Sequence, residues 1–104
     1  MNYHEFRQLV ANQPLTLAYF STDDCTVCKS LKPKVLGLLK DHPEWTLTYV
    51  DSYESPEVAG QLLVLSVPVI VLFVEGQEAG RFGRHLAMND LEHSLSRFES
   101  LLQS

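Results

Sequence analysis

The chain has 104 residues, of which 45% are hydrophobic and 10% aromatic, so its composition excludes a disordered chain and allows a real core. Its formal net charge of −5 excludes a broad phosphate-binding surface, and we expect no nucleic-acid partner. No apolar run is long enough to cross a bilayer, and the N-terminus lacks the pattern of a signal peptide. We therefore expect one domain over residues 1–104, located in the cytoplasm, with no membrane partner.

The first half of the chain alternates helical and strand patterns. Asn2 and Glu5 have the spacing of a capping box, and Pro14 ends the helix that they begin. The run "LTLAYFS" at 15–21 is short, apolar and bounded by turn formers, which predicts a buried strand. Apolar residues at helical spacing between positions 27 and 39 predict the next helix.

The second half continues this alternation. Residues 46–51 alternate with period two and are rich in strand formers, and Ser55 followed by Pro56 predicts the beginning of a helix. Residues 67–83 predict a hairpin with its turn at 75–77. Asn89 and Glu92 have the spacing of a second capping box, at the beginning of an amphipathic final helix.

The predicted order is α-β-α-β-α-β-β-α. The first two strands are joined through a helix, so they should be parallel with a right-handed crossover, whereas the last two should be antiparallel. This is an α/β fold with a four-stranded mixed sheet flanked by helices on both faces.

The only two cysteines, Cys25 and Cys28, follow the first strand and precede a helix. A zinc site normally needs four ligands, and the four histidines show no paired spacing, so we expect surface histidines and no metal. A structural disulfide across two residues would close a very small loop and contribute little. A redox pair fits best, because Cys-x-x-Cys beside a βαβ pattern is a known redox signature.

The position of the pair assigns a role to each thiol. At a helix N-terminus the unpaired N–H groups and the helix dipole stabilise a thiolate, which makes Cys25 the expected nucleophile. Cys28 lies one turn further in and is the expected resolving thiol. Catalysis then needs no cofactor beyond the Cys25–Cys28 disulfide.

These residues resemble the thioredoxin family over nearly the whole chain. The resemblance rests on the cysteine motif followed by Lys29, on Pro33, on Asp51, on Val67–Pro68, and on Gly76 in the hairpin turn. It implies a thioredoxin fold without the first strand of thioredoxin itself, and a cis bond before Pro68. It also implies that the backbone at Val67 and Pro68 binds an extended substrate, that the substrates are protein disulfides, and that the electron donor is a thioredoxin reductase or a low-molecular-weight thiol.

The motif departs from Trp-Cys-Gly-Pro-Cys at several positions. Asp24 replaces the tryptophan, and Tyr19 stands where the family has a buried aspartate. The simplest role for Asp23 and Asp24 is to cap the helix; their charges would also raise the pKa of the Cys25 thiol, which Lys29 would offset.

The sequence therefore favours a thiol–disulfide oxidoreductase that reduces protein disulfides. The alternative is a thioredoxin-fold binding or adaptor module with little or no turnover. A glutaredoxin-like enzyme is a weaker third interpretation, because the chain lacks the Cys-Pro-Tyr-Cys form and a Gly-Gly-x-x-Asp run after the hairpin.

Overall fold

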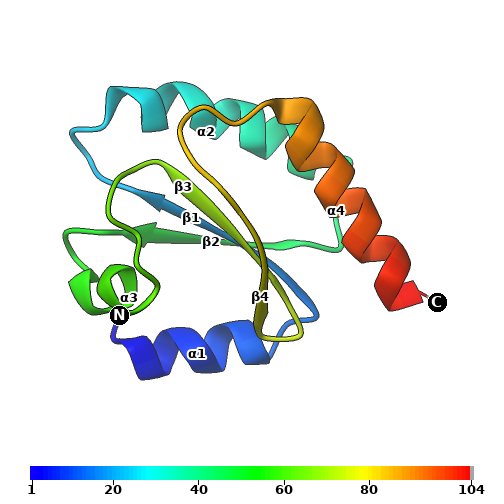
Figure 1. Ribbon diagram of the computed structural model, residues 1–104, viewed down its shortest axis with the longest axis horizontal. Coiled ribbons are helices and arrows are strands. Elements are labelled where there is room, and N and C mark those ends of the chain that lie inside the picture. Colours follow the sequence, from blue (N-terminus) through cyan, green and yellow to red (C-terminus); the bar gives the residue numbers. More distant parts are fainter. Residues whose placement is uncertain (104) are drawn as a thin grey trace.

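The computed structural model describes residues 1–103, and its elements follow the predicted order. The helices and strands, shown in Figure 1, are α1 (Tyr3–Ala11), β1 (Leu15–Ser21), α2 (Thr26–Leu39), β2 (Thr46–Asp51), α3 (Pro56–Gln61), β3 (Val69–Val74), β4 (Gln77–Phe82) and α4 (Met88–Gln103).

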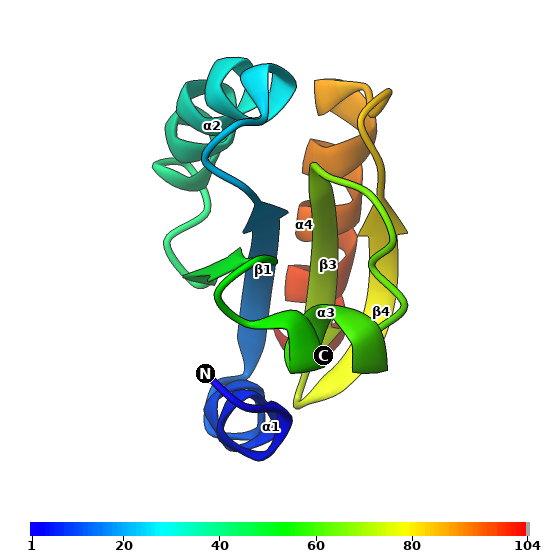
Figure 2. The ribbon, with the colours of Figure 1, turned by 90° about the vertical axis from the view of Figure 1, so that its left-hand side faces the viewer.

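The four strands form one mixed sheet in the order β2-β1-β3-β4. Strand β1 is parallel to β2 and antiparallel to β3, and β3 is antiparallel to β4, as predicted. Phe20 is paired with Val69, and Ile70 with Phe82. The carboxyl ends of β1 and β4 and the beginning of β3 consequently lie at the same end of the sheet, where Figure 2 shows them together.

Helices cover both faces of the sheet (Figure 1). Successive side chains of a strand point to opposite faces, so β1 contributes to two cores. One core joins Leu17 and Tyr19 to buried residues of α2 and α4, and the other joins Ala18 and Phe20 to buried residues of α1 and α3. Six of the seven residues of β1 are buried, which makes this strand the centre of the fold.

Most of the predicted signals for helix ends and turns are confirmed. Asn2 and Glu5 form the capping box of α1, with backbone-to-side-chain hydrogen bonds of 2.9 and 2.8 Å. Pro56 is at the beginning of α3. Glu75 and Gly76 form the turn between β3 and β4 with φ of 50° and 83°, the left-handed conformation of a tight hairpin turn.

The predicted start of the last helix was wrong by two residues. Helix α4 begins at Met88, so Asn89 lies within it and not at its cap. The backbone N–H groups of Asp90 and Leu91 both donate to the Ala87 carbonyl, which closes the first turn earlier than the sequence pattern indicates.

Candidate redox site

Cys25 lies at the N-cap of α2. The chain leaves β1 at Ser21, and Cys25 has extended backbone angles immediately before the helix begins at Thr26. Its Sγ accepts a hydrogen bond of 3.1 Å from the backbone N–H of Cys28. The sulfur therefore occupies the position of a capping oxygen, at the positive end of the helix dipole.

Cys25 and Cys28 form a disulfide with their Cα atoms 5.2 Å apart. The two residues are 8% and 3% exposed, so Cys25 is the more accessible of a largely buried pair. Both belong to the core between the sheet and helices α2 and α4. The pair can exist as a disulfide or as two thiols, which is the chemistry of a two-electron thiol–disulfide couple.

The acidic residues before Cys25 do not cap the helix, and that prediction was wrong because the cysteine sulfur occupies the cap. Asp24 instead accepts hydrogen bonds from Thr22 Oγ1 at 2.7 Å and from the Tyr53 hydroxyl at 3.3 Å. The bond from Thr22, with smaller contributions from Tyr53 and the charge of Lys29, lowers the pKa of Asp24. Asp24 is therefore a carboxylate at neutral pH, beside the redox pair in sequence.

Tyr19 of β1 contacts helix α2, which carries Cys28. Its hydroxyl donates a 2.7 Å hydrogen bond to the carbonyl oxygen of Cys28. Burial, with a smaller contribution from Tyr49, raises the pKa of Tyr19 to about 12. A group with that pKa is no base at neutral pH, so Tyr19 ties β1 to α2. A cavity of about 220 Å³ opens beside it and is lined by Tyr19, Ser21, Thr22, Asp23, Cys28, Lys29 and Lys32.

Pro68 lies at the same end of the sheet as the cysteines. The Val67–Pro68 peptide bond is cis, and Pro68 is buried. Val67 packs against the core cluster that contains both cysteines. A second cavity, of about 180 Å³, brings this segment beside the one that precedes Cys25; it is lined by Thr22, Ser52, Tyr53, Val64, Leu65, Ser66 and Val67.

Sequence reasoning missed Arg84. This exposed residue follows β4, and its Nη2 donates a 3.0 Å hydrogen bond to the carbonyl oxygen of Val67. No local motif marks a contact between residues so far apart in the chain; only the pairing of β3 with β4 brings them together.

A second polar cluster lies outside the redox site. The prediction that the histidines lie at the surface holds for His4, His85 and His93 but is wrong for His42, which is 7% exposed. His42 Nδ1 lies 2.6 Å from Glu99 Oε2, and the same oxygen accepts a 2.8 Å hydrogen bond from the indole N–H of Trp45. His42 Nε2 is 3.6 Å from Glu92. The two carboxylates stabilise the buried imidazole of His42, and these partners could not be predicted from the sequence.

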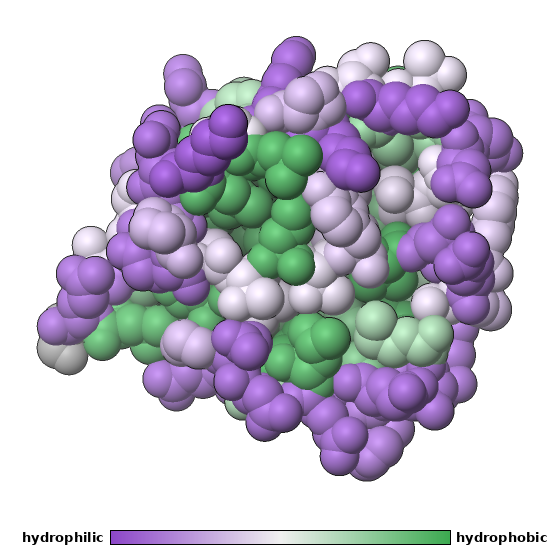
Figure 3. All heavy atoms as spheres, turned by 180° about the vertical axis from the view of Figure 1, so that it is seen from behind, coloured by the Kyte–Doolittle hydropathy of each residue, from purple (hydrophilic) through white to green (hydrophobic). Residues whose placement is uncertain are grey.

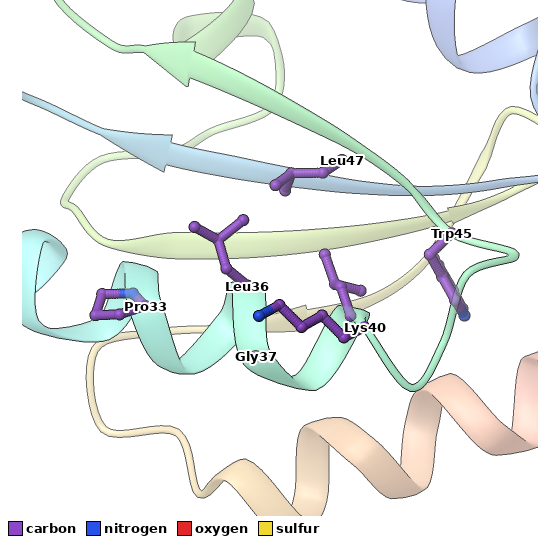
Figure 4. Close-up of a pocket in the computed structure, with 7 residues that line it drawn as sticks. Pro33, Leu36, Gly37, Lys40, Trp45 and Leu47 are labelled. Carbon is purple, nitrogen blue, oxygen red and sulfur yellow. The ribbon is translucent and has the colours of Figure 1, made fainter.

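Trp45 also lines a groove of about 610 Å³ between α2 and β2 (Figure 4). The other lining residues are Pro33, Leu36, Gly37, Leu39, Lys40 and Leu47, so neither cysteine faces this groove. On the back of the molecule, Figure 3 shows hydrophobic side chains gathered in patches among hydrophilic ones.

Residues 1–103 contain no group of three or more His, Cys, Asp or Glu placed to hold a metal ion. In the same part of the chain, no helix has both the length and the apolar character to cross a membrane.

A disulfide held by only two intervening residues at the beginning of a helix, on a mixed sheet of this topology, defines a thiol–disulfide oxidoreductase. The chain belongs to the thioredoxin family: the family model Thioredoxin matches residues 1–97.

Individual relatives agree with this membership. The chain is 31% identical over 94 residues to thioredoxin-like protein YdfQ of Bacillus subtilis, covering 90% of this chain and 84% of that protein. The crystal structure of oxidised mitochondrial thioredoxin 3 from Saccharomyces cerevisiae superimposes with a TM-score of 0.83 and 28% identity, over 92% and 90% of the two chains. A structure that describes thiol resolution in a yeast mitochondrial 1-Cys peroxiredoxin via glutathione and thioredoxin systems gives a TM-score of 0.82 and 26% identity, over 90% and 88%.

Proposed function

We propose that this oxidoreductase works as a reductant of protein disulfides, with Cys25 as the attacking thiol and Cys28 as the resolving thiol. The observation that carries the assignment is the position of the Cys25 sulfur at the N-cap of α2, where it accepts the N–H of Cys28. A thiolate is stabilised there by the same N–H group and by the helix dipole. The deeper burial of Cys28 suits a thiol that acts only after a mixed disulfide has formed.

The proposed cycle is balanced in atoms and electrons. The Cys25 thiolate attacks one sulfur of the substrate disulfide, forms a mixed disulfide, and releases the first substrate thiolate, which takes a proton from solvent. The Cys28 thiol loses its proton and attacks Cys25 Sγ, which forms the intramolecular disulfide and releases the second substrate thiol. Two electrons pass to the substrate, and a thioredoxin reductase or a low-molecular-weight thiol supplies two more, which reduce the Cys25–Cys28 disulfide back to two thiols.

We further propose that the backbone at Val67 and Pro68 pairs with an extended substrate segment, and that the charges of Asp24 and Lys29 modulate the reactivity of Cys25. The cavity shared by the segments 22, 52–53 and 64–67 supports a binding place beside the cysteines. The similar structure that describes a peroxiredoxin supports a protein as the disulfide substrate. A reductant of this kind requires a reducing compartment, and we propose the cytoplasm.

Two measurements test the proposal. Insulin reduction should be driven by dithiothreitol and, if a reductase is the donor, by NADPH with a thioredoxin reductase. Substoichiometric iodoacetamide should label Cys25 of the reduced protein first, and Cys28→Ser should accumulate mixed disulfides on Cys25 while Cys25→Ser accumulates none. Preferential labelling of Cys28 would overturn the assignment of roles to the two thiols. If neither donor supports insulin reduction, the proposed reduction of protein disulfides is overturned.

A further inference from the structure

Arg84 is a cation at the edge of the redox site. It follows Gly83 in the segment between β4 and α4, and it is exposed. Its Nη2 donates a hydrogen bond of 3.0 Å to the Val67 carbonyl. This bond holds the guanidinium against the segment that immediately precedes Pro68.

The sheet topology places this cation beside the cysteines. The end of β1 leads into Cys25, the beginning of β3 follows Pro68, and the end of β4 leads to Arg84. These three strand ends lie at the same end of the sheet (Figure 2). Val67, which Arg84 contacts, packs against the cluster that includes Cys25 and Cys28. A substrate segment lying along Val67 would therefore pass close to the guanidinium.

Arg84 has no carboxylate partner among residues 1–103, where the ion pairs involve only His42 and Arg81. Arg81, three residues before Arg84 in the chain, pairs with Glu78 instead. A guanidinium carries five N–H donors, and the bond to Val67 uses one of them, so most of the donors of Arg84 are available to a ligand. The planar fork of these donors matches a carboxylate in a bidentate arrangement.

We infer that Arg84 is a specificity-determining residue that favours substrate disulfides with an acidic side chain on the side that lies against Val67. The inference rests on the proposed function, since it concerns the substrates of that same site. The preference runs against the net charge of −5, which by itself would favour basic substrates. It also separates two sides of the site, because Asp23 and Asp24 precede Cys25 and repel a carboxylate there.

The test uses the reduced full chain and three disulfide-linked peptides that differ only in the residues flanking cysteine, which are Glu, Gln or Lys. The quantity measured is the second-order rate constant of disulfide reduction. The wild-type protein should reduce the Glu peptide up to about fivefold faster than the Gln peptide at low salt, the size of an exposed ion pair. High salt should reduce this ratio, because it screens exposed charges.

Three variants make the result specific. Arg84→Gln should abolish the preference for the Glu peptide, and Arg84→Lys should retain part of it because the charge remains. Arg97→Gln, which removes an exposed arginine in the middle of α4, should leave the preference unchanged although it changes the net charge equally. A Glu-to-Gln ratio that is the same in the wild type and in Arg84→Gln would overturn the inference.

The outcomes separate this inference from the proposed function. If the wild type reduces all three peptides at equal rates, only the role of Arg84 fails. If it reduces none of them, the proposed function fails. Should Arg84→Gln not fold, the comparison of the wild type with Arg84→Lys and the salt dependence of the wild-type ratio still decide the matter.

Discussion

The carboxylate of Asp24 is fixed by Thr22 and Tyr53, and the hydrogen bonds that lower its pKa keep it charged. A negative charge next to Cys25 favours the protonated thiol. We expect Asp24→Asn to lower the pKa of the Cys25 thiol and to increase its alkylation rate at neutral pH by about two- to fivefold, as for an exposed charge interaction. The measurement is the pH profile of alkylation by iodoacetamide.

Asp41→Asn is the matched control for this comparison, because Asp41 is exposed and lies after the opposite end of α2. It should leave the alkylation profile of Cys25 unchanged. An identical profile in Asp24→Asn would mean that the Asp24 charge does not reach the sulfur and that its bonds to Thr22 and Tyr53 serve only the loop.

Tyr19 offers a second residue-scale prediction. Tyr19→Phe removes the 2.7 Å hydrogen bond to the Cys28 carbonyl and keeps the ring in the core. We expect the free energy of unfolding to fall by about 0.5–1.5 kcal/mol in a urea titration. The pH profile of insulin reduction should keep its shape, because a hydroxyl with a pKa of about 12 does not exchange protons near neutrality. A displaced profile would show that Tyr19 takes part in proton transfer.

At this scale the sequence predicts what depends on neighbours in the chain. Cys25 and Cys28 are found because their spacing and the adjoining strand and helix patterns are local. The capping role of Asp23 and Asp24 was predicted wrongly because a sulfur at the N-cap competes with their oxygens. The contact of Arg84 with Val67 depends on strand pairing, which no single residue pattern encodes.

Helix α4 is attached to the segment between α2 and β2 through buried polar groups. Glu99 of α4 binds both His42 and Trp45. Glu92, also on α4, has its carboxylate 3.6 Å from Nε2 of His42. Burial disfavours the charged imidazole, but the hydrogen bond and charge of Glu99, with those of Glu92, outweigh it and raise the pKa of His42 above its ordinary value. The attachment of α4 is therefore strongest when His42 is protonated.

The consequence for stability has a definite sign. Because the pKa of His42 is higher in the folded state, the contribution is complete below the unfolded value of about 6.5 and is lost as the pH rises through the folded value. We expect His42→Gln to lower the free energy of unfolding more at pH 6 than at pH 9. His93→Gln, which replaces an exposed histidine of α4, is the control variant. Equal losses at both pH values would contradict the role of His42.

Element bounds could be predicted well where the flanking signals are strong. Strands β1 and β2 have the predicted limits because a proline or a change of periodicity stands beside them. The beginning of α4 was predicted wrongly because Asn89 and Glu92 have the spacing of a capping box, whereas the bonds to the Ala87 carbonyl start the helix at Met88. His42 was misplaced because its partners, Glu92 and Glu99, come from α4, at least 50 residues away.

The arrangement of the whole molecule leaves β2 at the edge of the sheet, with β1 as its only neighbour among the described strands. An edge strand exposes backbone donors and acceptors that can pair with another chain. Here Tyr49 of β2 is 43% exposed, and the ammonium group of Lys32 lies 4.5 Å from its ring centre. A charged side chain above an exposed strand is one of the features that discourage edge-to-edge association.

The overall topology was predictable because each connection has few solutions. A strand, a helix and another strand give a parallel pair, and a two-residue turn gives a hairpin. The groove between α2 and β2 was not predictable, since it results from how Leu36, Trp45 and Leu47 fit together in space. The cavities beside the cysteines have the same origin.

The position of Trp45 determines which changes in this protein can be followed by tryptophan fluorescence. It is the only tryptophan, it is 6% exposed, and it follows α2, whereas the disulfide lies at the beginning of that helix, so about 15 Å of helix separates them. A disulfide quenches an indole only at short range, so reduction with dithiothreitol should leave the emission intensity almost unchanged. The indole N–H instead shares Glu99 with His42, and titration of His42 should alter the emission. Fluorescence would thus follow the attachment of α4, and an emission change on reduction would show that the redox state reaches this far end of the molecule.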